Sequence, residues 1–204
     1  MTEVSRETRE HLEIFRAEFL RWNARINLTS DRDPDAIVER HIEDSLQLAP
    51  FGRGAATWFD IGTGGGFPGA VLAAAFAGNG PRVTMVESNH KKAGFLRAAC
   101  IAMGVDASVV AQRVEAVIAR TPPPDVVSAR AVASLPDLLS LLSPWLVGGT
   151  RAVLPKGRVV QAEIDAAALE WDFALKRHPS RTARDATILE VTDLRPKLAG
   201  FSRS

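Results

Sequence analysis

The sequence predicts an α/β fold with a mainly parallel sheet, an antiparallel strand near the C-terminus and a helical N-terminal extension. Three observations support this prediction. From residue 57 onward, short apolar segments alternate with helical ones. These segments are apolar almost throughout, as in parallel strands that helices cover on both faces. The first of them runs directly into a glycine-rich turn, which an alanine-rich helix follows.

Length and composition limit the class of protein. The 204 residues fit a single domain, predicted as an extension over residues 1–52 and a core over residues 53–204. With a formal net charge of +1, any nucleic acid must be bound by local basic patches. The lone Cys100 excludes an internal disulfide and a zinc site built on several thiolates, and we expect no metal. No signal peptide or membrane-spanning run is visible, so we expect a cytoplasmic protein with no membrane contact, and nothing suggests more than a monomer.

The N-terminal extension is predicted to contain two helices. Four large apolar residues recur at helical spacing among charged ones: Leu12, Phe15, Phe19 and Trp22. They predict an amphipathic helix over residues 5–23, followed by a break near Asn27. A second helix is expected to begin at Asp33-Pro34, an N-cap followed by proline, and to end at Pro50.

Seven segments of the core are predicted as strands. They cover residues 58–61, 82–87, 108–111, 125–128, 151–154, 173–178 and 187–191. Helices are expected from Pro68 and over residues 90–103, where Gly104 is well placed to end the second of them. Strands and helices in this order predict a Rossmann-like core.

The glycine-rich turn reads Asp60-Ile-Gly-Thr-Gly-Gly-Gly-Phe-Pro-Gly69. Glycines at a strand-to-helix junction let ligand atoms approach the backbone N–H groups. The spacing Gly64-x-Gly66-x-x-Gly69 matches the dinucleotide fingerprint, and Glu87 at the end of the next strand could hold the ribose hydroxyls of a nucleoside. Glu87 could also be no more than an exposed acid at the end of a strand.

Two observations favour S-adenosyl-L-methionine over a dinucleotide. Asp60 precedes the turn, where a carboxylate suits a ligand that carries an ammonium and a sulfonium but repels a pyrophosphate. The chain also leaves little room for the substrate domain of a dehydrogenase. We therefore expect Asp60, Gly64 and Glu87 at a cofactor site. The alternative is an NAD-binding oxidoreductase or a non-catalytic dinucleotide-binding module.

Several stretches of the chain together resemble one family. They are Trp22-Asn23 with Ile26-Asn-Leu-Thr29, Arg40-His-Ile-Glu-Asp-Ser-Leu46, Asp60 to Gly69, Val86-Glu-Ser-Asn89 with Lys91-Lys92, Arg113-Val-Glu115, Ser128-Ala-Arg-Ala131 and Lys156-Gly157. In this order and spacing the chain is similar to the RsmG (GidB) family of bacterial 16S rRNA guanine-N7 methyltransferases. The resemblance implies a class I methyltransferase fold and S-adenosyl-L-methionine as cofactor. It also implies the 530 loop of 16S ribosomal RNA, free or in the assembling small subunit, as substrate.

The resemblance also implies roles for individual residues. Cofactor contacts are implied at Gly62 and Phe67 in the turn, at Val114-Glu115 beside the adenine, and at Arg130 near the methionine end. Each lies just past the end of a predicted strand, where open α/β sheets bind ligands. Phe67 and Val114 could instead be core residues, and Glu115 a solvated acid in the first turn of a helix.

Substrate handling is implied at Asn27, His41, Arg113 and Lys156, although His41 could equally be a hydrogen-bonded helix residue. RNA phosphates could meet three basic patches, each of which could also be an ordinary charged surface. The patches are His90-Lys-Lys92 with Arg97, Lys156 with Arg158, and Lys176-Arg-His178 with Arg181 and Arg184.

The chemistry agrees with guanine N7 as acceptor. This nitrogen offers a lone pair and loses no proton, so no general base is needed. Methylation of cytosine C5 needs an activated cysteine, whereas Cys100 lies in the middle of a predicted helix. The Asn/Asp-Pro-Pro-aromatic loop of many amino-group methyltransferases is replaced by Ser128-Ala-Arg-Ala131. Another RNA, a protein or a small molecule stays open as acceptor.

Overall fold

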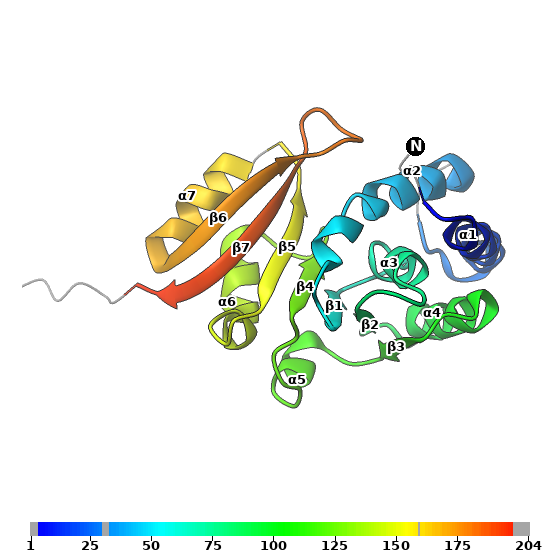
Figure 1. Cartoon of the computed structure of the whole chain (residues 1–204), viewed down its shortest axis with the longest axis horizontal. Helices are drawn as coiled ribbons and strands as arrows, with labels where there is room; N and C mark the ends of the chain where they lie inside the picture. Colours follow the sequence, from blue (N-terminus) through cyan, green and yellow to red (C-terminus); the bar gives the residue numbers. More distant parts are fainter. Residues whose placement is uncertain (1–3, 30–32, 159, 198–204) are drawn as a thin grey trace, which may run out of the picture.

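The computed structural model describes residues 4–29, 33–158 and 160–197. A seven-stranded sheet with the order β3-β2-β1-β4-β5-β7-β6 runs through the molecule (Figure 1). Its strands are β1 (Thr57–Ile61), β2 (Arg82–Val86), β3 (Ala107–Val110), β4 (Val126–Ala129), β5 (Arg151–Lys156), β6 (Trp171–Pro179) and β7 (Thr187–Pro196). The strands β1 to β5 are parallel, and β7 pairs antiparallel with both β5 and β6. The predicted fold class is confirmed.

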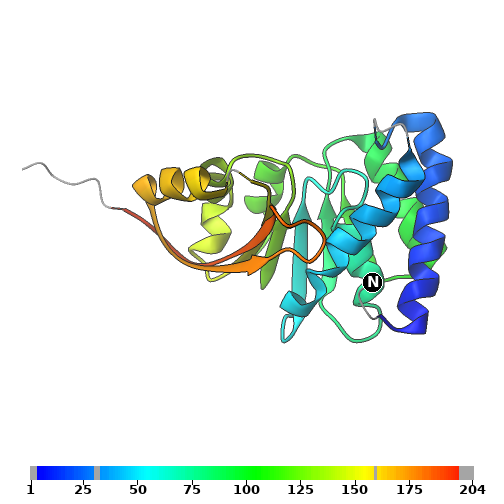
Figure 2. The same ribbon diagram turned by 90° about the horizontal axis from the view of Figure 1, so that it is seen from above.

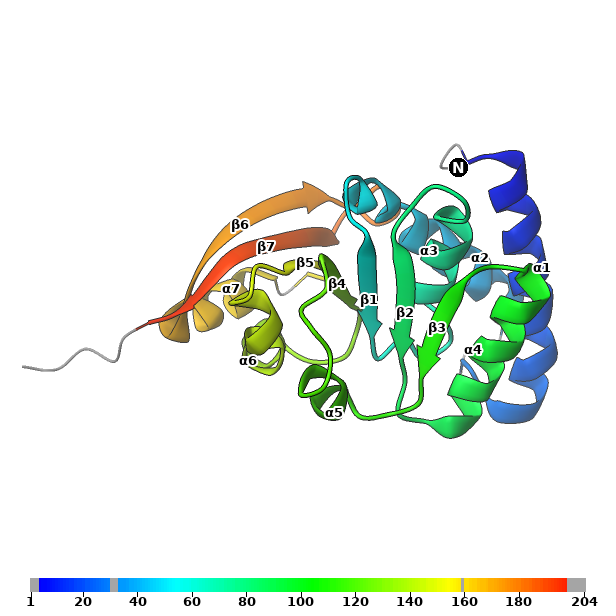
Figure 3. The same ribbon diagram turned by 60° about the horizontal axis from the view of Figure 1, so that its bottom comes forward.

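Helices cover both faces of the sheet, as Figures 2 and 3 show. One face packs against α1 (Arg6–Ile26), α2 (Pro34–Leu46), α3 (Gly69–Ala75) and α4 (His90–Met103). The other packs against α5 (Val114–Ile118), α6 (Leu135–Leu146) and α7 (Val160–Glu170), while the short 3-10 helix η1 (Ala49–Gly52) leads into β1. Because strand side chains alternate between faces, Trp58 lies in the first core and Ile61 in the second.

The helix ends differ from the predicted ones for local reasons. The helix α1 continues to Ile26, three residues past the prediction, and stops where Asn27 takes the left-handed conformation with φ 54°. The helix α2 begins as predicted, with the Asp33 side chain accepting a hydrogen bond from the Ala36 N–H. It ends at Leu46, and Pro50 lies in η1 instead of at the end of α2.

An aromatic cluster joins the N-terminal helices to the core. The Phe15 ring lies 5.5 Å from that of Phe67 and 6.1 Å from that of Phe95, and Phe19 contacts both of these rings as well. Phe15, Phe19 and Phe95 are almost completely buried. Truncating a ring of this kind to alanine typically costs about 3–5 kcal/mol. The N-terminal helices are therefore packed into the same core as the glycine-rich turn.

The strands β6 and β7 are longer than predicted, and the loop that joins them extends toward α2. This loop reaches the end of α2, as Figure 2 shows. There the Arg181 N–H donates to Gln47 Oε1 at 3.0 Å, and Gln47 Nε2 donates to the Thr182 hydroxyl at 3.3 Å. This contact encloses the space between α2 and the carboxyl ends of β4 and β5. None of the described helices has the length and hydropathy that a membrane crossing requires.

Candidate active site

The glycine-rich turn leaves part of its backbone open. Gly62 and Gly64 have φ angles of 65° and 56°, a region that residues with a Cβ avoid. The Gly62 N–H donates to the Val86 carbonyl at 2.9 Å and so ties the turn to β2. A Cβ on Gly64 would have only the Gly62 carbonyl oxygen within 4 Å, at 3.8 Å. The surface of the turn at Gly64 is therefore accessible to a ligand.

Asp60 lies behind this turn and not on its surface. Its side chain is fully buried, and its Oδ2 accepts a hydrogen bond from the Gly69 N–H at 2.9 Å. Its Oδ1 accepts from the Ser128 hydroxyl at 2.7 Å, and the Trp58 indole donates to the same hydroxyl at 2.8 Å. Burial raises the pKa of Asp60 to about 6, although these hydrogen bonds oppose the shift. Direct ligand contact by this carboxylate, as the sequence suggested, does not fit its position; Asp60 fixes the shape of the turn.

Glu87 lies beside the turn, directly after β2, and its side chain is largely buried. Its Oε2 accepts from the Gly64 N–H at 2.9 Å and its Oε1 from the Asn89 N–H at 2.7 Å. An ionised carboxylate offers about four acceptor sites, so each oxygen can still accept one more hydrogen bond. The fixed carboxylate and the accessible glycine backbone beside it fit the adenosine part of S-adenosylmethionine.

The segment Arg113-Val-Glu115 reaches the same edge of the sheet from β3. The Glu87 N–H donates to the carbonyl of Val110, the last residue of β3, at 3.1 Å. Val114 begins α5 and is partly buried against the second core, whereas Arg113 and Glu115 are exposed. The segment therefore follows β3, and Glu87 follows the neighbouring strand β2.

Arg130 forms a cluster with residues of the turn and of α2. Its guanidinium carbon lies 5.7 Å from the centroid of the Phe67 ring, and its Nη1 lies 3.3 Å from His41 Nδ1. The Asp44 carboxylate is 3.7 Å from the same nitrogen. Burial lowers the pKa of Arg130, and the charges of Asp44 and Asp60 oppose this shift. The side chain of Phe67 packs in the core and against Arg130, in agreement with the alternative of a core residue.

Lys156 is positioned differently from an RNA-binding lysine. Its side chain is only 10% exposed, and its Nζ donates to the Ala133 carbonyl at 2.9 Å and to Glu163 at 2.8 Å. The ion pair with Glu163 on α7 holds the ammonium inside a pocket, and contact of Lys156 with the substrate stays a prediction. Arg158 is exposed but pairs with Asp185 at 2.9 Å.

Asn27 is exposed at the end of α1 and close to the turn. The carbonyl oxygen of the next residue, Leu28, lies 3.7 Å from where a Cβ on Gly65 would be. In the first basic patch, Lys91 is exposed, and Arg97 donates to the Val109 carbonyl at 3.0 Å. The structure therefore places Asn27 close to the turn, whereas Lys91 and Arg97 lie on the exposed surface of α4.

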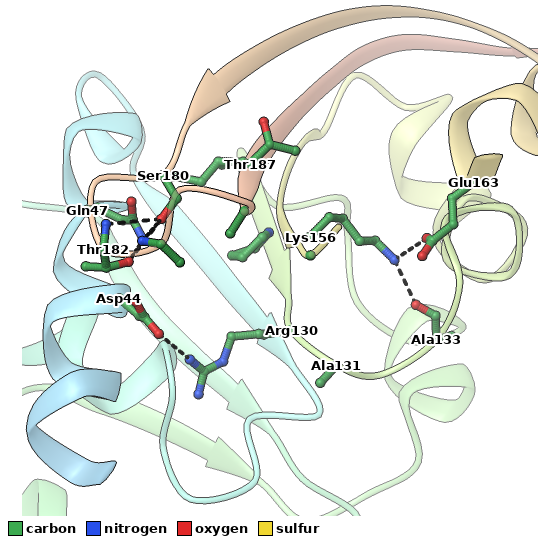
Figure 4. A pocket seen from close by; sticks show the side chains of 15 residues that line it. Asp44, Gln47, Arg130, Ala131, Ala133, Lys156, Glu163, Ser180, Thr182 and Thr187 are labelled. Atoms are coloured by element: carbon green, nitrogen blue, oxygen red, sulfur yellow. Dashed lines mark hydrogen bonds and ion pairs between the residues drawn. The ribbon is translucent and has the colours of Figure 1, made fainter. Parts of the chain in front are cut away.

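A pocket of about 360 Å³ adjoins the Arg130 cluster (Figure 4). Its walls come from α2, from the segments that follow β4 and β5, from α7 and from the β6–β7 loop. Asp44, Gln47 and Thr182 lie on one side, and Lys156 with Glu163 on the other. Ile61 and Ala129 are register partners at the ends of β1 and β4, so the glycine-rich turn and the segment with Arg130 leave the same edge of the sheet. Arg130 lines the pocket and contacts Phe67, so it connects the pocket to the turn.

Other chemistries have little support at this site. Cys100 is buried on α4, and burial raises the pKa of its thiol to about 11, which leaves no thiolate for nucleophilic attack. Among the residues that the structure describes, no cluster of histidine, cysteine and acidic side chains could hold a metal ion.

Comparison with known proteins establishes the family. The family model of rRNA small subunit methyltransferase G (GidB) matches residues 8–186. The chain belongs to this family. Ribosomal RNA small subunit methyltransferase G of Chelativorans sp. is 44% identical over 94% of the chain and 92% of that protein. The protein of the same name from Brucella ovis is 45% identical over 95% of the chain and 92% of its own length.

Solved structures agree at the level of the fold. An O-methyltransferase from Bacillus cereus in complex with SAH has a TM-score of 0.60 at 18% identity and covers 88% of this chain and 90% of its own. Magnesium protoporphyrin IX methyltransferase from Synechocystis PCC 6803, with bound SAM, has a TM-score of 0.58 at 13% identity and covers 95% and 100%. The predicted class I methyltransferase fold and the predicted family are thus confirmed.

Sequence reasoning missed three polar residues of the pocket. Asp44 lies within a motif that carries the resemblance to the family, but nothing in its spacing pointed to a pocket. Gln47 and Thr182 are 135 positions apart in the chain, and only the folded hairpin brings them together.

Proposed function

We propose that this chain transfers the methyl group of S-adenosyl-L-methionine to N7 of a guanine in the 530 loop of 16S ribosomal RNA. Membership of the rRNA small subunit methyltransferase G family supports the coarser activity, methylation of small-subunit ribosomal RNA. The observation that carries the proposal is the contact between Arg130 and Phe67, which joins the glycine-rich turn to a pocket large enough for a base.

The cofactor is assigned to the exposed surface of the glycine-rich turn beside Glu87. The Glu87 carboxylate would accept hydrogen bonds from the ribose hydroxyls, and the open backbone at Gly64 would admit the nucleoside. The segment from Val114 to Glu115 borders the adenine. Gly62 and Phe67 in the turn, together with Arg130, border the methionine end. Asp60 holds the turn in shape from behind through its hydrogen bond with Gly69.

The reaction places modest demands on the protein. When bound, the cofactor supplies an electrophilic methyl carbon: the N7 lone pair forms the new bond, and the electron pair of the breaking S–C bond stays on sulfur. No proton leaves the base, so the protein has to orient the acceptor and exclude water rather than provide a general base. Arg130 is held by Phe67, His41 and Asp44 where the two ligands would meet, and this gives it a positioning role.

Ribosomal RNA is also consistent with the charged residues around the site. Exposed basic residues occur on α2 at Arg40, before α5 at Arg113, and on the β6–β7 loop at Arg181 and Arg184. Phosphates account for most of the affinity in such interfaces. The His41 ring lies 5.1 Å from that of Phe67 in the turn, and Asn27 precedes Leu28, which also lies beside the turn, so both could contact the substrate. The protein acts as a monomer in the cytoplasm, where ribosomal subunits are assembled.

Mapping of modified guanines tests the proposal. We expect 16S ribosomal RNA from cells that carry the gene to contain 7-methylguanine in the 530 loop, and RNA from a deletion strain to lack it. The purified protein with S-adenosyl-L-methionine should restore the modification on RNA or subunits from the deletion strain. RNA from the deletion strain that still carries the modification would contradict the assignment of the target, and efficient methylation of free guanosine would indicate a small-molecule enzyme instead.

A further inference from the structure

The pocket beside Arg130 contains two carboxylates in different situations. Glu163 already accepts hydrogen bonds from the Leu135 N–H at 2.6 Å and from Lys156 at 2.8 Å, both through Oε2. Asp44 makes looser contacts, 3.7 Å to Arg130 and 3.9 Å to His41. Glu163 therefore holds the wall of the pocket together, whereas Asp44 has acceptor capacity for a ligand.

Asp44 is also kept ionised within the pocket. Burial alone would raise the pKa of its carboxyl, but the nearby side chains of His41 and Thr182 and the charge of Arg130 hold the pKa below its ordinary value. Its side chain is 24% exposed, and Figure 4 shows the carboxylate pointing toward Arg130 at the side of the pocket that is nearest α2. An ionised carboxylate that is partly withdrawn from water selects for a partner with adjacent donors.

Guanine presents such donors on its Watson–Crick edge. Its N1–H and its N2 amine point in the same direction, whereas adenine offers an acceptor at N1 and has no amine at position 2. An enzyme that modifies a base inside folded RNA must turn that base out of its stack, and it commonly reads the base through this edge. Small apolar side chains, among them Ala131 and Ala186, give the pocket surfaces on which a flat ring can lie.

A groove of about 540 Å³ continues from the pocket across α2 and shares Gln47 and Thr182 with it. Arg40 and Arg181 line this groove, together with Glu39 and Glu43. A nucleotide whose base is in the pocket carries its phosphates at the mouth, and these two arginines can contact them there. The groove therefore gives the RNA backbone a route to the pocket.

We propose that Asp44 accepts hydrogen bonds from N1–H and the N2 amine of the extruded target guanine, and so determines the choice of guanine. This inference rests on the proposed function and adds the residue that recognises the base. Methylation at N7 leaves a positive charge on the purine and strengthens the N1–H and N2–H donors. The interaction with the Asp44 carboxylate is therefore tighter in the transition state than in the ground state, which is the condition for catalysis.

The test combines a protein variant with an RNA variant. Small-subunit RNA is assembled with either guanosine or inosine at the target position, since inosine keeps N7, O6 and N1–H but lacks the N2 amine. Rates of methyl transfer are compared for the wild type, Asp44→Asn and Asp44→Ala. We expect the wild type to prefer guanosine over inosine by about tenfold, the size of one good base contact, and the preference to disappear in both variants.

Matched variants separate recognition from general damage. Glu163→Gln changes the other carboxylate of the pocket. It is expected to slow methyl transfer to both RNAs equally and to keep the preference for guanosine over inosine. Asp172→Asn, an exposed aspartate on β6, should change neither rate. Thermal unfolding and calorimetric affinity for S-adenosyl-L-methionine show whether each variant is folded. If the wild type accepts inosine and guanosine equally, or if a folded Asp44 variant keeps the wild-type preference, the role of Asp44 is refuted while the proposed function stands. A wild type that forms no 7-methylguanine on this RNA would overturn the proposed function, and the role of Asp44 with it.

Discussion

The guanidinium of Arg130 lies on the ring of Phe67, with its central carbon 5.7 Å from the ring centroid. Phe67 belongs to the glycine-rich turn that follows β1, and Arg130 follows β4. A cation over an aromatic face is favourable by about 0.5–2 kcal/mol, the larger value applying where water is excluded. The contact therefore fixes the arginine at the junction between the cofactor turn and the pocket.

Arg130→Ala is expected to lose methyl transfer while the fold survives. The arginine is held by contacts with Phe67, His41 and Asp44, none of which belongs to the strands of the sheet. Loss of one positioned charged donor typically lowers turnover by about a hundredfold. Single-turnover kinetics on small-subunit RNA would measure the loss, and thermal unfolding would show that the protein is still folded.

Two further variants make the Arg130 test specific. Arg130→Lys keeps the charge but lacks the planar fork, so only partial recovery of the rate is expected. Arg158→Ala removes an arginine that is 84% exposed and pairs with Asp185 at the surface, and it should change the rate little. Turnover at the wild-type rate in folded Arg130→Ala would remove this residue from the site.

Gly64→Ala should weaken cofactor binding more than its effect on stability explains. A methyl group at Gly64 fits the protein, with a single atom within 4 Å, but it would project into the space assigned to the ligand. Gly78 offers a matched control on the loop before β2, since its φ is 84° and nothing lies within 4 Å of its Cβ position. An alanine in this backbone conformation costs about 1–2 kcal/mol at either position.

Calorimetry with S-adenosyl-L-methionine distinguishes the two glycine variants. We expect at least about a tenfold loss of affinity for Gly64→Ala, equivalent to about 1.4 kcal/mol, and no change for Gly78→Ala. Equal affinities in the two variants would place the cofactor elsewhere.

The parallel core could be predicted from the sequence because its signals are local. The segment over residues 58–61 is apolar apart from Asp60 and ends in a glycine-rich turn, and Gly104 ends α4 in the left-handed conformation, as expected. The N-cap at Asp33 also lies where the sequence predicts it. Such features depend on neighbours within a few positions, so the sequence contains the information needed to place them.

The pocket depends on contacts that no local pattern encodes. The loop after β6 meets Gln47 across 134 residues, because it reaches the end of α2 in the folded protein. Lys156 and Glu163 are seven positions apart, and they pair because the packing of α7 places Glu163 next to the end of β5. From the sequence, Lys156 therefore resembled an RNA-binding lysine, and Asp60 resembled a ligand contact although it is fully buried.

The burial of Asp60 predicts a specific pH dependence of stability. Its pKa is raised from 3.8 to about 6 in the folded protein. As the pH rises from about 4 to about 6, the unfolded chain releases this proton first, so the free energy of unfolding falls. The loss is complete above about pH 6 and amounts to about 3 kcal/mol, the free energy that corresponds to the shift. Asp60 thus stabilises the fold less at neutral pH than at acid pH.

Asp60→Asn should remove this pH dependence. The amide can accept from the Gly69 N–H through its oxygen and donate to the Ser128 hydroxyl through its nitrogen, while the Ser128 hydroxyl proton loses its acceptor; this cost is the same at every pH. Urea unfolding at about pH 4 and about pH 7.5 measures the free energy of unfolding of both proteins. The difference between variant and wild type should shift in favour of the variant by up to about 3 kcal/mol at the higher pH. Asp172→Asn serves as an exposed control. A constant difference between Asp60→Asn and the wild type at both pH values would show that the pKa of Asp60 is not raised.

Binding of RNA should depend on salt through individual arginines of the groove next to the pocket. Each phosphate contact releases counterions, so removing one basic contact lowers the slope of log affinity against log salt concentration by about 1. Arg181→Ala and Arg40→Ala are expected to show this change. Arg6→Ala is the control, because Arg6 is 91% exposed at the start of α1, the end remote from the turn. Filter binding of small-subunit RNA over a salt series measures the slopes, while cofactor affinity should change little in any variant. If the slope for Arg181→Ala equals that for Arg6→Ala, the RNA backbone does not follow the groove.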